Sequence, residues 1–151
     1  GLTILCYDKY VQVPDNKHIK SASLATIFNE ADVVSLHIPL TEETHYFADL
    51  DFFTAFRKPI YFLNIARGKI VDTSALVAAL KSGIVKAAGL DVLEYEETSF
   101  ERLFNDQHSE HLTFLKQAPN VILTPHIAGW TKESNFLLSD VLADKILNHP
   151  F

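Results

Sequence analysis

The sequence is poor in glycine, and this scarcity excludes several ligand-binding loops. Neither a Walker loop nor a G-x-S-x-G nucleophile elbow is present. No two glycines have the spacing of a G-x-G-x-x-G phosphate loop either. The chain therefore supplies no glycine-rich phosphate cradle of its own. Its five glycines are Gly1, Gly68, Gly83, Gly89 and Gly129.

Cysteine and methionine are equally scarce. Cys6 is the single cysteine, so no disulfide can form within the chain. Because Cys6 lies in an apolar run, we expect a buried, unreactive thiol in a reducing compartment, the cytoplasm. Methionine is absent, including an initiator, and the sequence opens directly on a strand-like run. We therefore expect these residues to be part of a longer protein.

Positive charge is in the minority, and long apolar runs are missing. The 151 residues carry 13 Lys and Arg against 19 Asp and Glu, a net charge of −6. This balance argues against nucleic acid and anionic lipid as partners. No apolar stretch approaches the roughly 18 residues of a membrane span, and the N-terminus lacks the features of a signal peptide. With 48% apolar residues, the chain has the composition of one globular domain.

Short apolar runs alternate with segments of helical period, which is typical of an α/β fold with a parallel sheet. Each run is almost continuously apolar, as expected for a strand covered on both faces. The five predicted strands are Leu2–Tyr7, Asp32–Ile38, Ile60–Ala66, Lys86–Val92 and Asn120–His126.

The segments between these runs predict helices. Asp72 is placed to cap one of them, which should end at Gly83. Phe52, Phe53 and Phe56 have helical spacing, and we expect them to fill the core. The predicted helices are Ser21–Ala31, Thr41–Phe56, Asp72–Gly83, Thr98–Gln117 and a final one over Lys132–Asn148.

Polar residues lie at or directly after the carboxyl end of each predicted strand. In an open parallel sheet these ends meet at one edge, outside which the ligand crevice lies. A polar residue at one strand end would be uninformative, because strands usually end in polar residues. Five such strand ends at one edge favour a crevice lined with groups that can bind or react with a ligand. The residues are Asp8, His37, Asn64 with Arg67, Asp91 and His126. We expect Asn64 to anchor backbone at its strand end.

Four stretches of the sequence, "DVVSLHIPLTEET", "LNIARGKIVD", "AAGLDVLEYEE" and "NVILTPHIAG", resemble the D-isomer-specific 2-hydroxyacid dehydrogenases. This family includes phosphoglycerate, glycerate and D-lactate dehydrogenases. The resemblance runs through essentially the whole chain and implies a Rossmann-like, doubly wound parallel sheet. It implies hydride transfer between NAD and a small 2-hydroxy acid or 2-keto acid. We expect residues 1–151 to form a partial NAD-binding domain.

The resemblance also implies three catalytic groups. Arg67 matches the arginine that holds the substrate carboxylate, a task suited to its planar fork. His126 matches the general base that exchanges a proton with the substrate oxygen. Glu96 matches the carboxylate that orients this histidine. Because Glu97 stands where the family commonly has proline, the neighbouring Glu94 and Glu97 stay open as alternatives to Glu96.

For NAD, the resemblance implies contacts at the strand ends. Asp8 matches the acid that accepts the ribose hydroxyls, which favours NAD over NADP, although a plain turn residue is the alternative. Asp91 resembles the carboxylate near the nicotinamide carboxamide, and Thr44 is at most a peripheral neighbour. The lone Trp130 either closes the substrate mouth or packs under it. The expected cofactor contacts are Asp8, His37, Ile38, Pro39, Ala66, Arg67, Asp91, His126 and Gly129.

We expect no metal site. His108, Glu110 and His111 have a spacing that could hold a metal, but a solvated helix face is the preferred interpretation. The segment Thr98–Gln117 carries no readable chemical signature, and the substrate's identity is not readable either.

The glycine-rich loop and first strand of such a domain are not in the sequence, and neither is the family's substrate domain. The resemblance equates the five runs with the second to sixth strands of the order 3-2-1-4-5-6, in which the first strand is central. The fold is therefore expected to be incomplete, with two unpaired strand edges. We expect the chain alone to be inactive and to pair with a complementing segment. For the whole protein we expect a homodimer. A non-catalytic NAD-sensing module of the corepressor type and an inactive remnant are the alternatives.

Overall fold

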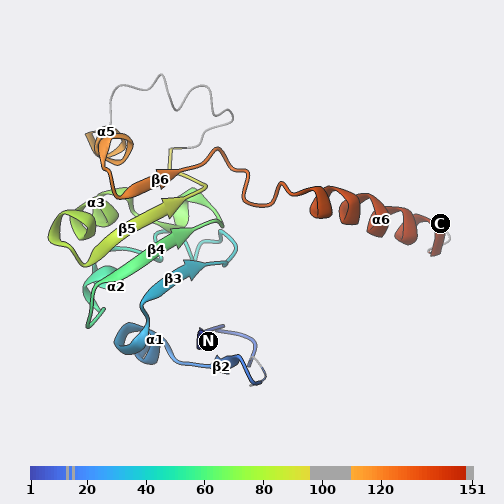
Figure 1. Ribbon diagram of the computed structural model, residues 1–151, viewed down its shortest axis with the longest axis horizontal. Coiled ribbons are helices and arrows are strands. Elements are labelled where there is room, and N and C mark those ends of the chain that lie inside the picture. Colours follow the sequence, from blue (N-terminus) through green and yellow to red (C-terminus); the bar gives the residue numbers. More distant parts are fainter. Residues whose placement is uncertain (13, 15, 96–109, 149–151) are drawn as a thin grey trace.

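Strands and helices alternate along the chain, as the sequence predicts (Figure 1). The computed structural model describes residues 1–12, 14, 16–95 and 110–148. The strands are β1 (Ile4–Cys6), β2 (Ile19–Ser21), β3 (Val33–Leu36), β4 (Ile60–Asn64), β5 (Val85–Leu90) and β6 (Val121–Leu123). The helices are α1 (Leu24–Glu30), α2 (Leu50–Thr54), the 3-10 helix η1 (Gly68–Ile70), α3 (Thr73–Ser82), α5 (Glu110–Gln117) and α6 (Lys132–Asn148).

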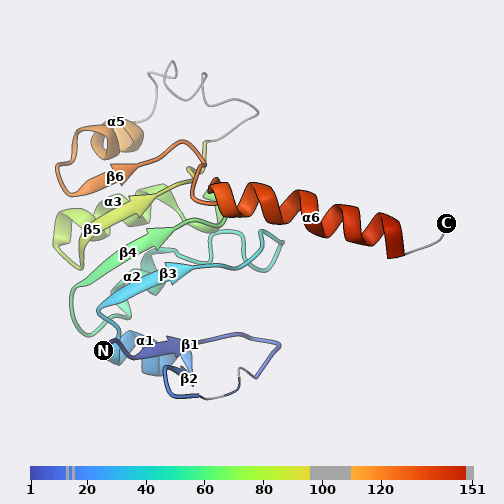
Figure 2. The ribbon, with the colours of Figure 1, turned by 45° about the vertical axis from the view of Figure 1, so that its right-hand side comes forward.

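The described strands form two separate parallel sheets. β1 pairs with β2, and the other four strands follow the order β3-β4-β5-β6. β1 lies on the side of the small sheet that faces β3 (Figure 2), yet the two strands are not paired. The facing edges of β1 and β3 are therefore open. This break confirms the expectation of an incomplete doubly wound sheet whose central strand is missing.

All five apolar runs contain a strand, but the sequence reading missed β2. This strand has only three residues, Ile19–Ser21, and includes a lysine, so it lacks the apolar run that marks the others. Its pairing with β1 places it third in the doubly wound order. The described residues therefore form one strand more than the five that were expected as the second to sixth.

The helix predictions are confirmed in part. α3 and α6 agree with their predicted ranges, and Asp72 caps α3 through the N–H groups of Ser74 and Ala75. Gly83 ends α3 at φ 79°, the left-handed conformation that glycine favours. α1 lies inside its predicted range, and α5 forms the part of the predicted Thr98–Gln117 helix that is described; residues 96–109 lie outside the described part.

The helix predicted over Thr41–Phe56 is wrong, because only α2 forms there. Its first part is a turn in which the Thr44 hydroxyl donates to the Pro39 carbonyl at 2.6 Å. Asp49 then starts α2 by accepting from the N–H of Phe52 at 2.8 Å. Side chains that bind nearby backbone compete with a continuous helix, and here they replace it with a turn and a short one.

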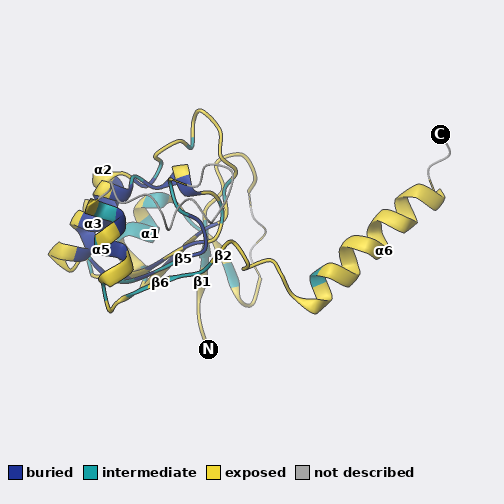
Figure 3. Ribbon diagram, turned by 90° about the horizontal axis from the view of Figure 1, so that it is seen from above, coloured by how far each residue is buried: buried dark blue, intermediate teal, exposed yellow. Residues whose placement is uncertain are grey.

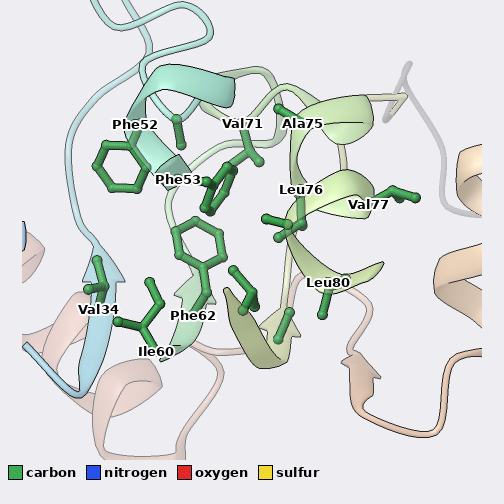
Figure 4. Packing of buried hydrophobic residues seen from close by; sticks show 14 of the residues in the cluster. Val34, Phe52, Phe53, Ile60, Phe62, Val71, Ala75, Leu76, Val77 and Leu80 are labelled. Atoms are coloured by element: carbon green, nitrogen blue, oxygen red, sulfur yellow. The ribbon is translucent and has the colours of Figure 1, made fainter. Parts of the chain in front are cut away.

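The core lies between one face of the four-stranded sheet and helices α2 and α3 (Figure 4). Phe53 and Phe62 pack edge to face with ring centroids 5.1 Å apart. Phe52 and Phe56 are also buried, which confirms that the three predicted phenylalanines fill the core. Leu76 of α3 is 1% exposed and closes the same cluster.

The other face of the four-stranded sheet is largely uncovered. β4 alternates buried and exposed residues, and Tyr61 is 49% exposed. Val33 on β3 and Ile122 on β6 are exposed too, at 57% and 69%. The prediction of strands covered on both faces is therefore wrong for the described residues, because their helices pack on one side. Cys6 is half-buried instead of buried, since it lies in the small open sheet.

Helix α6 extends away from the rest of the molecule (Figures 1 and 3). Of its residues, all except Ser134 are exposed, although many of them are large and apolar. Among the described residues, no helix combines the length and apolar character needed to cross a membrane. The exposed apolar residues of α6 are Phe136, Leu137, Leu138, Val141, Leu142, Ile146 and Leu147.

Candidate functional site

The carboxyl ends of β3, β4, β5 and β6 lie in one row. Leu36 pairs with Asn64, Asn64 with Leu90, and Leu90 with Leu123. Because the strands are parallel and in register, the loops that follow them leave from the same edge. The structure thus brings together the loops that carry four of the five predicted strand-end groups.

The fifth group, Asp8, follows β1 in the separate small sheet. Its Oδ1 accepts the backbone N–H groups of Tyr10 at 2.8 Å and Val11 at 2.9 Å. These two hydrogen bonds lower the pKa of the Asp8 carboxyl and form a turn after β1. Asp8 is exposed. The adjoining Tyr10 hydroxyl donates to Glu43, so the Asp8 loop is attached to the loop that follows β3.

Asn64 anchors the loop that carries Arg67. The Asn64 side chain accepts the N–H of Ala66 at 3.1 Å and donates to the carbonyl of Arg67 at 3.0 Å. It is 1% exposed, so both of its hydrogen bonds are shielded from water. This confirms the expected anchoring role. The Arg67 side chain is exposed, and its Nη1 donates to the Ala66 carbonyl at 2.7 Å.

Gly68 brings the Arg67 loop against the loop that follows β5. A Cβ atom at this position would lie 1.9 Å from the carbonyl oxygen of Leu93. Backbone atoms leave no room for it, so only glycine fits. The loops after β4 and β5 are therefore in direct backbone contact.

Asp91 holds the loop that carries His126. Asp91 is 3% exposed, and its Oδ1 accepts from the Thr124 hydroxyl at 2.6 Å and from the Ile127 N–H at 2.9 Å. Its Oδ2 accepts the N–H of Ala128 at 2.9 Å. Burial alone would raise the pKa of Asp91, but these three donors and the nearby His126 lower it. Both carboxylate oxygens are thus occupied by the chain itself.

His126 adopts a left-handed backbone conformation, with φ 54°. Its N–H donates to the Asp91 carbonyl at 2.9 Å. Non-glycine residues rarely adopt positive φ, and such a conformation persists only where neighbouring contacts impose it. Asp91 provides those contacts on both sides of His126, and His126 itself is an exposed residue in the loop that follows β6.

The remaining predicted contacts line the same edge. The His37 Nε2 lies 2.9 Å from the Ser35 hydroxyl, and His37 and Pro39 are exposed. Ile38 packs partly against the core. Gly129 and Trp130 are exposed after the His126 loop, so Trp130 does not pack under the site.

Three predicted residues need separate mention. Glu96 lies outside the described residues, as does His108. His111 is on α5, and no group of three metal-ligating side chains occurs within residues 1–12, 14, 16–95 and 110–148. Glu94, considered only as a neighbour of Glu96, contacts both Tyr46 and α3. The sequence did not indicate a role for Tyr46, because Tyr46 and Glu94 are 48 residues apart and meet only in the folded chain.

We expect Asp91→Asn to destabilise the protein by about 2 kcal/mol at neutral pH, because an amide cannot accept from three donors at once. The folded pKa of Asp91 is below its unfolded value, so its contribution is present above the unfolded pKa of about 4 and is lost as the pH falls through the folded one. Urea unfolding of the full-length protein at neutral pH and near pH 3 measures this.

Asp32→Asn is the matched control, because Asp32 forms an exposed ion pair with Lys58. It should leave the stability nearly unchanged. Equal unfolding midpoints for the wild-type protein and Asp91→Asn at neutral pH would contradict the assigned role.

The comparisons with known proteins agree with this geometry. Residues 1–128 match the family model described as "D-isomer specific 2-hydroxyacid dehydrogenase, NAD binding domain". An aromatic 2-oxoacid reductase of Clostridium sporogenes is 32% identical over 130 residues, which are 85% of this chain and 39% of that protein. The chain thus spans well under half the length of this relative.

Solved structures give the same result. A D-2-hydroxyisocaproate dehydrogenase superposes with a TM-score of 0.83 at 27% identity, covering 99% of this chain and 47% of that one. A D-lactate dehydrogenase from Aquifex aeolicus, complexed with NAD and lactic acid, has a TM-score of 0.73 at 33% identity, covering 97% and 46%. The match of the family model over most of its residues, together with these likenesses, shows that the chain belongs to the NAD-binding domain of the D-isomer specific 2-hydroxyacid dehydrogenases.

Proposed function

We propose that the protein containing this chain transfers hydride between NAD and a small D-2-hydroxy acid or its 2-keto acid. The observation that carries the proposal is the row of strand ends from which the Arg67 and His126 loops both leave. A cation for a carboxylate and a titratable imidazole are the groups that this chemistry requires at one edge. Residues 1–151 are proposed to form one partial NAD-binding domain.

The residues at the sheet edge fit part of an NAD molecule. The exposed Asp8 carboxylate keeps acceptor capacity for ribose hydroxyls, and His37, Ile38 and Pro39 are the further proposed contacts of the adenosine half. The proposed contacts on the nicotinamide side are Ala66, Arg67, Asp91, His126 and Gly129. Asp91 would act there through the loop that it holds. Donors for the pyrophosphate are not among these residues, so the chain alone should bind NAD weakly.

The proposed substrate chemistry uses three side chains. Arg67 binds and orients the substrate carboxylate through its exposed guanidinium. His126 donates a proton to the keto oxygen in reduction and removes it in oxidation. Glu96 is proposed to hydrogen-bond His126 and stabilise its protonated form. When bound, NADH supplies the hydride to the keto carbon.

Substitution of Arg67 and His126 in the full-length protein tests this assignment. Arg67→Lys should raise KM for the keto acid about 10- to 100-fold, because a lysine cannot form the paired hydrogen bonds. His126→Asn should lower kcat about 100- to 10,000-fold through loss of proton transfer. NADH oxidation with pyruvate, phenylpyruvate, glyoxylate or hydroxypyruvate as the probe measures both.

Arg57→Lys and His18→Asn are matched controls, because both residues are exposed and lie away from the carboxyl ends of the strands. Both should retain wild-type kinetics. A full-length wild-type protein that binds NADH but turns over none of the four keto acids would contradict the proposal and favour an NAD-sensing module.

We also propose that a complementing segment inserts one parallel strand between β1 and β3. Two open strand edges face each other there, and unpaired edges promote association with further chain. In the full-length protein, the amides of β3 should exchange slowly with solvent. In residues 1–151 alone they should exchange much faster, or the chain should aggregate. A monomeric fragment whose β3 is as well protected as in the full-length protein would refute this segment.

A homodimer of the whole protein is proposed as well. Its support is the family membership and the large apolar surface that this chain exposes on the sheet and α6. Sedimentation equilibrium of the full-length protein at micromolar concentration should give twice the polypeptide mass. A single-chain mass would reject the dimer. The free thiol of Cys6 is compatible with the cytoplasm, which we propose as the compartment.

A further inference from the structure

Glu94 joins two parts of the chain that are far apart in sequence. Its Oε1 accepts from the Tyr46 hydroxyl at 2.5 Å, and its Oε2 accepts from the N–H of Thr73 at 3.0 Å. Thr73 is the first residue of α3, where the helix dipole favours a negative charge. Hydrogen bonds to an ionised acceptor are stronger than neutral ones. Glu94 therefore holds the chain after β5 to the start of α3 and to Tyr46.

Tyr46 is itself attached to the loop that carries Arg67. The N–H of Tyr46 donates to the Lys69 carbonyl at 2.9 Å, and the N–H of Ala48 donates to the Ile70 carbonyl at 3.0 Å. Tyr46 has φ 54°, a conformation that is unfavourable for a bulky residue without support from its surroundings. The hydrogen bond to Glu94 raises the pKa of Tyr46 to about 12.

The Arg67 loop is thus held from several directions. Asn64 fixes the Arg67 carbonyl from β4. Gly68 lies against the backbone of Leu93 and Glu94, where a Cβ atom would come within 2.6 Å of the Glu94 nitrogen. The Glu94 carboxylate fixes the far end of the same loop at Thr73. Removing this carboxylate would take away the contacts with Thr73 and the Tyr46 hydroxyl, while Asn64 and the backbone hydrogen bonds of Lys69 and Ile70 would remain.

We propose that Glu94 is a positioning residue for Arg67: by bridging Tyr46 and Thr73 it fixes the Arg67 loop in the orientation in which the guanidinium meets the substrate carboxylate. The inference rests on the proposed function, because it concerns the binding of the same keto acid. It assigns to Glu94 and Tyr46 an effect on substrate affinity without contact with the substrate.

The test uses Tyr46→Phe and Glu94→Gln in the full-length protein. The first variant removes one hydroxyl, and the second leaves one carbonyl oxygen for two donors. KM for pyruvate or phenylpyruvate should rise about 5- to 20-fold in both variants, while KM for NADH stays within about twofold, because only the keto acid depends on the orientation of Arg67. A purely structural role would reduce the amount of folded enzyme and lower the apparent kcat without changing either KM.

Tyr61→Phe is the matched control, since it removes a hydroxyl from the exposed face of the sheet and should leave both KM values unchanged. The proposal is overturned if KM for the keto acid is unchanged in Tyr46→Phe and Glu94→Gln, or if KM for NADH rises equally.

A wild-type protein without turnover would defeat the proposed function separately. Amide hydrogen exchange of residues 68–73 would then decide whether Glu94 positions this loop. Exchange that is faster in both variants than in Tyr61→Phe supports the role, and unchanged exchange overturns it.

Discussion

The parallel pairing of β3, β4, β5 and β6, which is in register at their carboxyl ends, is the constraint on which the rest of the site depends. It aligns Leu36, Asn64, Leu90 and Leu123, so that four loops begin at one level. A shift of one residue in β4 would exchange its buried and exposed faces, and Phe62 would leave the core. The packing of Phe62 against Phe53 therefore fixes the register, and the register in turn fixes where the reactive loops start.

Beyond the strand ends, polar side chains shape the loops by binding backbone. Asn64 holds the Arg67 loop, and Asp91 holds the His126 loop. Both residues are almost fully buried, so an unmade hydrogen bond at either would be costly. The two groups assigned to chemistry, in contrast, are exposed at the edge. Because Asn64 and Asp91 are buried and hydrogen-bonded, the loops that they hold can keep the exposed Arg67 and His126 in a defined position.

Sequence reasoning identified the elements whose signals are local. Asp72 and Gly83 bound α3 through capping contacts within a few residues, and the apolar runs of β3 to β6 are readable without tertiary information. The reading failed at β2, a three-residue strand recognisable only by its pairing with β1, and at the turn that Thr44 forms. It found Arg67, Asp91 and His126 as strand-end groups. It did not find that the Asp91 carboxylate is occupied by the His126 loop, because donors from residues 124 to 128 meet it only in the folded chain.

The described residues expose a large apolar surface. One sheet face, the open edges of β1 and β3, and α6 together expose side chains that a stable domain normally buries. α6 carries its apolar residues around the whole helix, a distribution typical of a helix enclosed on several sides. The site edge, by contrast, has its backbone anchors within the chain itself. The described residues thus determine the local geometry of the site, whereas the bare sheet face and α6 contribute little burial of apolar surface to the free energy of folding.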